Sequence, residues 1–506
     1  MSEQGRKTRL IYNEDADTLG GYRRNFHPAP MSLDEYLREL FEPLIDTHVD
    51  TYVWCCGSVA GLHYDSKVGR CSLERFDNPE TTFDNTHAWR RWTNLKTYME
   101  TGHSPVTVVG ENARELGLET FVSLRMNDCH DAYQPDVYTG SIKKEHPEWL
   151  IGEPGREYEK NSIPWWMRKA FNYAVDELRR FVVDLVEELL DFDYDGVELD
   201  FLSHPFLFRL GEEQSAAPEV TEMLGKIKRM ACERGKRLMV RVPATVERCL
   251  RIGYDVPAWI EAGVVDMLSL GRNVTPAVTP TGDWVRLVDG TDVTIYPAIN
   301  TNVTPKHVTA DALRAFGMQH LSEGAHGVYL FNFFEQPWIK HHKVFHGAEY
   351  GWDALRELGS IDALARRNKL YLVDALEKHI PGAYGHAIPE DLVDLPMELS
   401  RAGESGRVLF RIGDRLDDDA PREVFLRLEM INLTEADELR LLLNGRRLIG
   451  ETRVYPYTTG VDVAFHASPS VLRRGENELD IGISKRNKRI GLNIIVEHVE
   501  ISIRYV

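Results

Sequence analysis

The sequence predicts an α/β fold, a (β/α)8 TIM barrel, followed by a small all-β sandwich of jelly-roll type. Up to about residue 350, short apolar or β-branched runs alternate with amphipathic helical stretches, which is typical of a parallel sheet built from βα units. Eight such runs favour a closed barrel over an open sheet. From about residue 385, long helical patterns give way to short alternating runs separated by turn residues. A chain of 506 residues suits two domains, and we place them at 1–380 and 381–506.

The expected barrel elements follow the order strand, helix, strand along the chain. The strands are 9–13, 45–54, 120–127, 196–202, 237–243, 265–271, 293–300 and 327–334. The helices are 32–41, 111–117, 171–192, 218–235, 257–263, 309–325, 352–359 and 361–380. In 171–192 apolar residues recur every three or four positions, which predicts one buried stripe. The connection between the sixth and seventh strands has no clear helix.

The C-terminal runs alternate apolar and polar residues and predict an antiparallel sandwich. They are 396–401, 407–413, 423–433, 439–445, 461–467, 477–485 and 494–506.

The composition disfavours several classes of partner. Asp and Glu number 79 against 60 Lys and Arg, and no basic run interrupts the acidity, so nucleic acid and membrane partners are disfavoured. The N-terminus lacks the apolar stretch of a signal peptide, so we expect an unexported, cytoplasmic protein. The six cysteines are scattered without a CxxC pair, which predicts reduced thiols.

The fourth predicted strand carries the main candidates for catalysis. Active sites of TIM barrels form at the C-terminal ends of the strands. Alternation along this strand turns its apolar residues toward the helices and sends Glu198 and Asp200 into the barrel. Buried carboxylates need partners, and Arg125 and Arg241 are available on the neighbouring strands. We predict that Asp200, at the strand end, is catalytic, whereas Glu198 is open to either a catalytic or a structural role.

Hydrolysis of a glycosidic bond by paired carboxyl groups requires a second acid from another strand. Glu335, just past the eighth strand, is slightly preferred over Asp128, just past the third. Asp15, Asp50 and Glu247 stay open as further candidates.

Other polar and aromatic residues fall at or near predicted strand ends. The candidates for substrate binding are His48, Asp50, Trp54, Arg125, Asn127, His204, Arg241, Asn300 and Asn332. Alternation in the second strand places His48, Asp50 and Trp54 on one inward face, with Trp54 near the mouth as an apolar platform for a sugar ring. Asn127 has a second interpretation, a helix cap or turn, and Arg241 is expected to pair with an inward acid.

Two alternatives to paired-carboxylate hydrolysis stay open. His48, Asp50, Asp128 and Asp200 form a candidate ligand set for a metal-dependent hydrolase, isomerase or lyase. The fifth and sixth strands supply no further histidine, so we expect neither a metal nor another cofactor. The other alternative is a glycan-binding protein without catalysis.

Three segments carry a family resemblance. HPEWL at 146–150, YAVDELRRFVVDLVEELL at 173–190 and YDGVELDFL at 194–202 resemble the central segment of the family-10-like glycosyl hydrolase group of bacterial proteins. The resemblance implies functional acids at Glu198 and Asp200, and a carbohydrate as substrate. LLLNGRRL at 441–448 and LRRGENELDIGIS at 472–484 resemble galactose-binding-like modules appended to glycosidases. We therefore expect a glycoside hydrolase, with its oligomeric state open.

Overall fold

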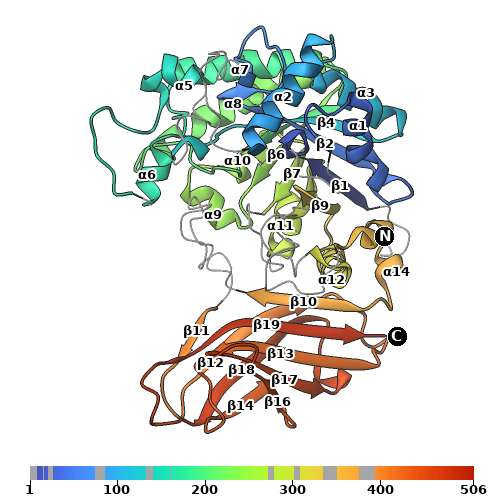
Figure 1. The fold of residues 1–506 in the computed structure, drawn as a ribbon, viewed down its shortest axis with the longest axis vertical. Coiled ribbons are helices and arrows are strands. Elements are labelled where there is room, and N and C mark those ends of the chain that lie inside the picture. Colours follow the sequence, from blue (N-terminus) through green and yellow to red (C-terminus); the bar gives the residue numbers. More distant parts are fainter. Residues whose placement is uncertain are drawn as a thin grey trace.

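The computed structural model describes residues 8–14, 16–20, 27–73, 86–132, 141–160, 162–271, 279–300, 308–333, 350–374 and 394–505. A closed barrel of eight parallel strands is followed by a sandwich of two antiparallel sheets, shown above and below in Figure 1. The predicted fold class is confirmed.

Eight parallel strands form the barrel wall. They are β1 (Arg9–Glu14), β2 (Thr51–Ser58), β4 (Glu119–Arg125), β5 (Gly196–Asp200), β6 (Arg237–Val242), β7 (Met267–Leu270), β8 (Thr294–Asn300) and β9 (Gly327–Phe331). The wall closes because β1 pairs in parallel with both β9 and β2. A two-residue strand, β3 (Gly61–Leu62), pairs antiparallel with the end of β2. All eight predicted strands are present, and the largest shift is in β2, expected at 45–54.

The strands present two faces with different surroundings. One face packs with the helices in the largest apolar cluster of the protein. The other face fills the barrel and forms a smaller cluster of its own: Ile11, Val53, Phe121, Met239, Met267, Tyr296, Ala298, Tyr329 and Phe331. This division decides which predicted site residues point inward.

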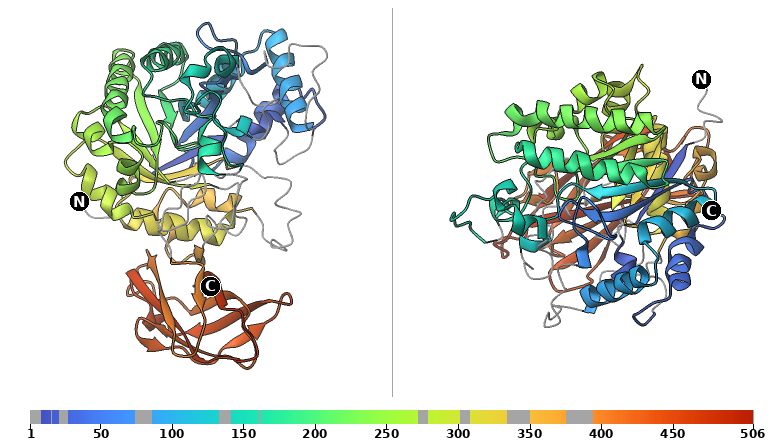
Figure 2. Two further views of the ribbon diagram at one scale, coloured as in Figure 1. Left: turned by 90° about the vertical axis from the view of Figure 1, so that its left-hand side faces the viewer. Right: turned by 90° about the horizontal axis from the view of Figure 1, so that it is seen from above.

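Helices surround the barrel, as the two views in Figure 2 show. The longer ones are α1 (Leu33–Phe41), α2 (Thr86–Glu100), α3 (Pro105–Glu115), α7 (Asp176–Asp191), α8 (Glu213–Glu233), α11 (Thr281–Val288) and α12 (Ala310–Ser322). The shorter ones are α5 (Ser141–Glu145), α6 (Ile163–Met167), α9 (Val246–Arg251), α10 (Val256–Glu261) and α14 (Ile361–Leu364). Helix α11 fills the connection where the sequence showed no clear helix, and it buries Trp284 and Val288. None of the described helices is both long and apolar enough to span a membrane.

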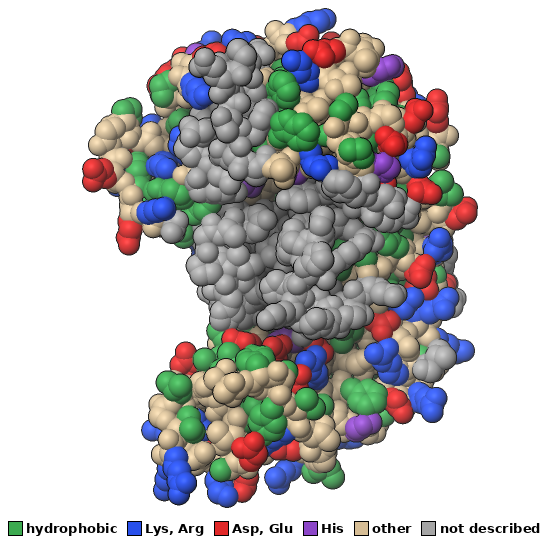
Figure 3. Space-filling view, in the orientation of Figure 1, with side chains coloured by type: hydrophobic (Ala, Val, Ile, Leu, Met, Phe, Trp, Pro, Cys, Tyr) green, Lys and Arg blue, Asp and Glu red, His purple; other side chains and the backbone are tan. Residues whose placement is uncertain are grey.

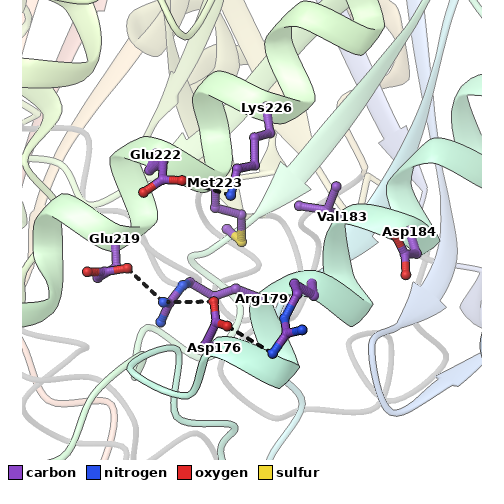
Figure 4. Close-up of a pocket in the computed structure, with 9 residues that line it drawn as sticks. Asp176, Arg179, Val183, Asp184, Glu219, Glu222, Met223 and Lys226 are labelled. Atoms are coloured by element: carbon purple, nitrogen blue, oxygen red, sulfur yellow. Dashed lines mark hydrogen bonds and ion pairs between the residues drawn. The ribbon is translucent and has the colours of Figure 1, made fainter.

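Charged side chains line a small pocket between α7 and α8 on the outside of the barrel (Figure 4). Arg179 pairs with Asp176 and Glu219, and Lys226 pairs with Glu222 at 2.8 Å. These pairs bridge or reinforce two neighbouring helices, so we interpret this pocket as structural. On the face drawn in Figure 3, acidic and basic side chains are interspersed.

The sandwich has a six-stranded and a four-stranded sheet. Its strands are β10 (Lys369–Asp374), β11 (Met397–Leu399), β12 (Ser405–Ile412), β13 (Glu423–Ile431), β14 (Glu438–Leu443), β15 (Arg446–Arg447), β16 (Thr452–Val454), β17 (Gly460–Ala467), β18 (Gly475–Lys485) and β19 (Ile494–Arg504). In β13 buried residues alternate strictly with more exposed ones, as expected for a sheet with one face on the core. All seven predicted C-terminal strands are found.

Strand β10 corrects the expected helix at 361–380. Helix α14 ends at Leu364, and β10 then pairs antiparallel with β19 along its whole length. Burial of Tyr371 and Val373 in the sandwich core explains why this segment is extended rather than helical. A strand of the sandwich sheet therefore lies before residue 381.

Helix α12 of the barrel packs against the sandwich. Its Ala315 belongs to the sandwich core. Glu323, directly after the helix, pairs with Arg411 at 2.6 Å, and Asp311 in its first turn pairs with Arg504 at 2.7 Å. The contact is thus apolar at its centre and charged at its rim.

Candidate functional site

Two inward residues of β5 lie level with polar residues of the flanking strands. Asp200 is in register with Arg125 of β4 and with Arg241 of β6. One step deeper, Glu198 is in register with Ser123 of β4. The parallel register thus places an acid between two arginines at the C-terminal end of the barrel, where TIM barrels form their active sites.

Asp200 is 1% exposed and is held by four contacts. Its Oδ1 accepts hydrogen bonds from the backbone amides of Leu202 and Ser203 at 2.9 and 3.0 Å. Its Oδ2 accepts one from the Ser203 hydroxyl and lies 2.9 Å from Nη1 of Arg241. Burial raises the pKa of Asp200, but Arg241, Arg125 and these hydrogen bonds outweigh it and lower the pKa below its usual value. Asp200 is therefore ionised at neutral pH.

Glu198 lies fully buried below Asp200. Its two carboxyl oxygens accept hydrogen bonds from the hydroxyls of Ser123 and Tyr329, both at 2.7 Å. Burial raises the pKa of Glu198 to about 7, against the lowering effect of Arg241 and these hydroxyls and with a further rise from Asp200. The two carboxyl groups of β5 thus have pKa values displaced in opposite directions.

Arg241 is fully buried and pairs with an inward acid, as expected. Its guanidinium carbon lies 3.6 Å from the ring centre of Phe331 and 5.6 Å from that of Tyr329. Both rings belong to β9, and they stabilise the guanidinium cation through cation–π contacts. Among the described residues, no acceptor forms a well-directed hydrogen bond with any of its three guanidinium nitrogens.

A second polar group forms just beyond β4 and β5. Asp128 is partly exposed, and its Oδ1 lies 2.7 Å from Nδ1 of His130. The ring of His130 meets that of His204 edge to face, with centres 4.9 Å apart. One ligand atom from each of the three residues lies within 4.8 Å of the others. Burial raises the pKa of Asp128, but His130, His204 and Arg125 hold it well below its usual value. We call these three residues the Asp128 cluster.

Asn127 has a structural role, which was the second interpretation of this residue. Its Oδ1 accepts a hydrogen bond from the amide of Phe171 at 2.7 Å, and its Nδ2 donates to the carbonyls of Phe171 and Phe206. The side chain is 1% exposed. Asn127 therefore connects the loops after β4 and β5 by hydrogen bonds, and its side-chain amide is not available to a sugar.

The prediction that His48, Asp50 and Trp54 lie on one inward face of the second strand is wrong. Strand β2 begins only at Thr51, so His48 and Asp50 lie at its N-terminal end, opposite the site. There His48 accepts a hydrogen bond from the amide of Gly359, and Asp50 accepts one from the Thr51 hydroxyl. Trp54 faces the helices, where its indole donates to the Tyr36 hydroxyl and its ring packs in the apolar cluster on that side of the strand. The four-residue metal set therefore does not converge.

The remaining predicted residues divide between the barrel end and the undescribed parts of the chain. Asn332 follows β9 at a φ of 52° and is 3% exposed, and its backbone amide donates to the side-chain oxygen of Asn13. Glu335 and the side chain of Asn300 lie outside the described residues. Their proposed roles stay predictions.

Several contributors were missed at the sequence level. Ser123 and Tyr329 bind Glu198, and Ser203 binds Asp200. Ser123 had a usable signal, because it precedes Arg125 by two residues and so shares its inward face. Ser203 lies in a loop, where no periodicity identifies direction.

No family model matches this sequence, and no curated protein matches it significantly. Among solved structures, it resembles the PgaB (BpsB) glycoside hydrolase domain from Bordetella bronchiseptica, at 12% identity and a TM-score of 0.40, over 70% of this chain and 99% of that one. A GH20 exo-β-N-acetylglucosaminidase from Vibrio harveyi matches at 12% and 0.40, over 70% and 54%. An α-galactosidase from Thermus thermophilus matches at 14% and 0.37, over 72% and 63%. These neighbours are glycoside hydrolases, but such low identities and scores do not determine the activity of this chain.

Proposed function

We propose that the protein is a glycoside hydrolase that cleaves an oligo- or polysaccharide at the C-terminal end of its barrel. The observation that carries this proposal is the position of Asp200. It is an ionised carboxylate on the last residue of β5, between Arg125 and Arg241 and above a carboxyl group with a raised pKa. Carboxyl groups whose environments separate their pKa values are typical of acid–base active sites.

Asp200 has the charge and the rigidity that this chemistry needs. The transition state of glycoside hydrolysis resembles an oxocarbenium ion, so a fixed negative charge beside the ring stabilises it. The backbone amides of Leu202 and Ser203 hold Asp200 in place without neutralising it. Glu198 lies one register step deeper in the barrel than Asp200, and Ser123 and Tyr329 bind both of its carboxyl oxygens, so we assign it a positioning role beneath Asp200.

The proton donor must be another residue, because Asp200 is ionised. We propose Glu335, which follows β9, the strand whose Tyr329 and Phe331 face Glu198 and Arg241. Asp128 is the alternative partner.

The first test is a screen for release of reducing ends from a panel of oligo- and polysaccharides. The variants are Asp200→Asn and, as a matched control, Asp193→Asn, whose carboxylate is exposed and pairs with Arg114. We expect Asp200→Asn to lose roughly 100-fold or more in activity while its melting temperature shows that it folds, and Asp193→Asn to keep full activity. Equal activity of the two variants, or binding of glycans by the wild type without any release, would overturn the proposal.

Nitrophenyl glycosides of the substrate class then distinguish the proton donors. A variant that lacks the general acid keeps activity on an activated leaving group and loses it on a poor one. We expect this behaviour for Glu335→Gln and not for Asp128→Asn. This test does not depend on the folding of any Asp200 variant.

A further inference from the structure

We propose that the Asp128 cluster binds a divalent transition-metal ion. Asp128, His130 and His204 supply one carboxylate oxygen and two imidazole nitrogens within 4.8 Å of one another. The residues come from two loops, the one after β4 and the one after β5, so the fold and not local sequence brings them together. Metal binding itself does not rest on the proposed glycosidase activity.

The spacing needs only a small adjustment to become a coordination shell. Zinc binds carboxylate oxygen and imidazole nitrogen at about 2.0–2.2 Å, which sets tetrahedral ligands about 3.3 Å apart. Asp128 and His130, which are hydrogen-bonded at 2.7 Å, have to move apart by about 0.6 Å, and the widest pair has to close by about 1.5 Å at most. Rotation of an imidazole ring about its side-chain torsions covers such a distance.

The loops that carry the cluster are fixed by buried contacts. Oδ1 of Asp128 also accepts the backbone amide of His130 at 3.0 Å. Lys143 donates to the backbone carbonyl of Asp128 and pairs with Asp131 at 2.9 Å, with both side chains buried. Asn127 binds the carbonyl of Phe206, whose own amide donates to the carbonyl of His204. Supports of this kind orient ligands before the ion arrives.

The neighbouring charges indicate which class of ion fits. The positive charge of Arg125 lowers the pKa of Asp128, and Asp131 neutralises Lys143. The surroundings are therefore not strongly negative, and one carboxylate is too few for Ca²⁺ or Mg²⁺, which prefer shells rich in oxygen. Two imidazoles and a carboxylate suit Zn²⁺, Co²⁺, Fe²⁺ or Mn²⁺. Three protein ligands leave at least one position for water or for a substrate hydroxyl.

The test uses the full-length chain, treated with EDTA and desalted, and titrated with CoCl2. We expect one equivalent of Co²⁺ to produce visible d–d absorption and ZnCl2 to displace it. His130→Ala, which removes a partly exposed ring, and His204→Gln, which keeps polarity at a buried position, should each weaken binding at least 10-fold. His146→Ala, which removes a partly exposed histidine ring stacked on Trp149, is the matched control and should bind like the wild type.

The absence of binding by the wild type would overturn the metal site. So would unchanged affinity in both cluster variants, or an equal loss in the His146→Ala control, which would indicate adventitious surface binding. One equivalent of metal in a protein that releases no sugar would support the site and count against the glycosidase proposal. The two proposals can therefore fail separately.

Discussion

Glu198 and Asp200 show how two residues on one strand acquire different protonation. Both are buried, but Asp200 has an arginine at 2.9 Å and two backbone amides, whereas Glu198 has only two neutral hydroxyl donors. Burial penalises a charge unless an opposite charge or several donors compensate it. Glu198 therefore keeps its proton up to about pH 7, and Asp200 loses its own.

Glu198→Gln should remove a pH dependence of stability. The pKa of Glu198 is about 7 in the folded protein, against about 4.3 for an unperturbed Glu. Between these values the folded state binds a proton that the unfolded state has lost, so stability falls as pH rises from 4.3 to 7, by roughly 3 kcal/mol. We therefore expect the free energy of unfolding of Glu198→Gln, relative to that of the wild type, to be higher at pH 8 than at pH 5. Urea unfolding at the two pH values measures this, and an unchanged difference between the two proteins would contradict it.

His320 of α12 should give the opposite dependence. Burial lowers its pKa to about 3, and its Nδ1 lies 2.7 Å from the Thr281 hydroxyl. Below about pH 6.5 the histidine is protonated in the unfolded state but stays neutral in the folded state. The stability that is present above pH 6.5 is therefore lost as the pH falls toward 3. The loss from this group should reach about 2 kcal/mol at pH 5. His320→Gln should flatten that part of the urea-derived stability profile, and a slope equal to that of the wild type would refute the assignment.

Among the elements, regular strands were predictable and loops were not. Alternation identified all seven predicted sandwich strands, and β-branched runs identified all eight barrel strands. The predicted inward face of β2 was wrong because Tyr52 and Trp54 pack outward against helices, and the pattern of a single strand does not reveal this. The segment of β10 was wrongly predicted as helix because its partner strand, β19, is more than a hundred residues away in the sequence. The pairing of Asp200 with Arg241 followed from alternation, whereas the Asp128 cluster depends on loop conformations.

Asn127 should stabilise the two loops that frame the site. Asn127→Ala removes three hydrogen bonds and leaves buried groups of Phe171 and Phe206 without that partner. We expect a loss of about 3 kcal/mol in the free energy of unfolding. Asn112→Ala, which removes one bond to the Val108 carbonyl within its own helix, should cost less than about 1 kcal/mol. Equal losses by chemical denaturation would show that Asn127 does not connect these loops.

At the scale of the whole molecule, a buried ion pair fixes the start of the sandwich. Lys369 of β10 pairs with Asp414 at 2.8 Å, and neither side chain is more than 1% exposed. The hydroxyls of Tyr371 and Tyr505 also bind Asp414. Burial lowers the pKa of Lys369, although Asp414 opposes the change. The pair joins the segment that leaves the barrel to the loop after β12.

Breaking this pair from one side should destabilise the sandwich strongly. Lys369→Met leaves the carboxylate of Asp414 buried without its cation, at a cost of about 3 to 5 kcal/mol. Adding Asp414→Asn should restore part of that stability, because the double variant buries no uncompensated charge. Arg366→Ala is the control, since its pairing with Asp419 is largely exposed on the arginine side. Denaturant unfolding of the wild type, Lys369→Met, Asp414→Asn and the double variant measures the coupling, and additive effects of the two substitutions would exclude it.

The contact between barrel and sandwich should depend on its apolar centre rather than on its charged rim. Ala315 of α12 is 2% exposed within the sandwich core, and a Cβ added at Gly413 would lie 2.5 Å from the Met318 carbonyl, so the backbones approach closely there. Arg411, the partner of Glu323, is 42% exposed, so Glu323→Gln should change the free energy of unfolding by less than about 1 kcal/mol. Ala315→Asp places a charge at a buried position within an apolar cluster and should separate the two parts energetically. We expect calorimetry to show one main transition for the wild type and for Glu323→Gln, and two for Ala315→Asp. A single unshifted transition for Ala315→Asp would mean that the sandwich and the barrel do not depend on this contact for their cooperative unfolding.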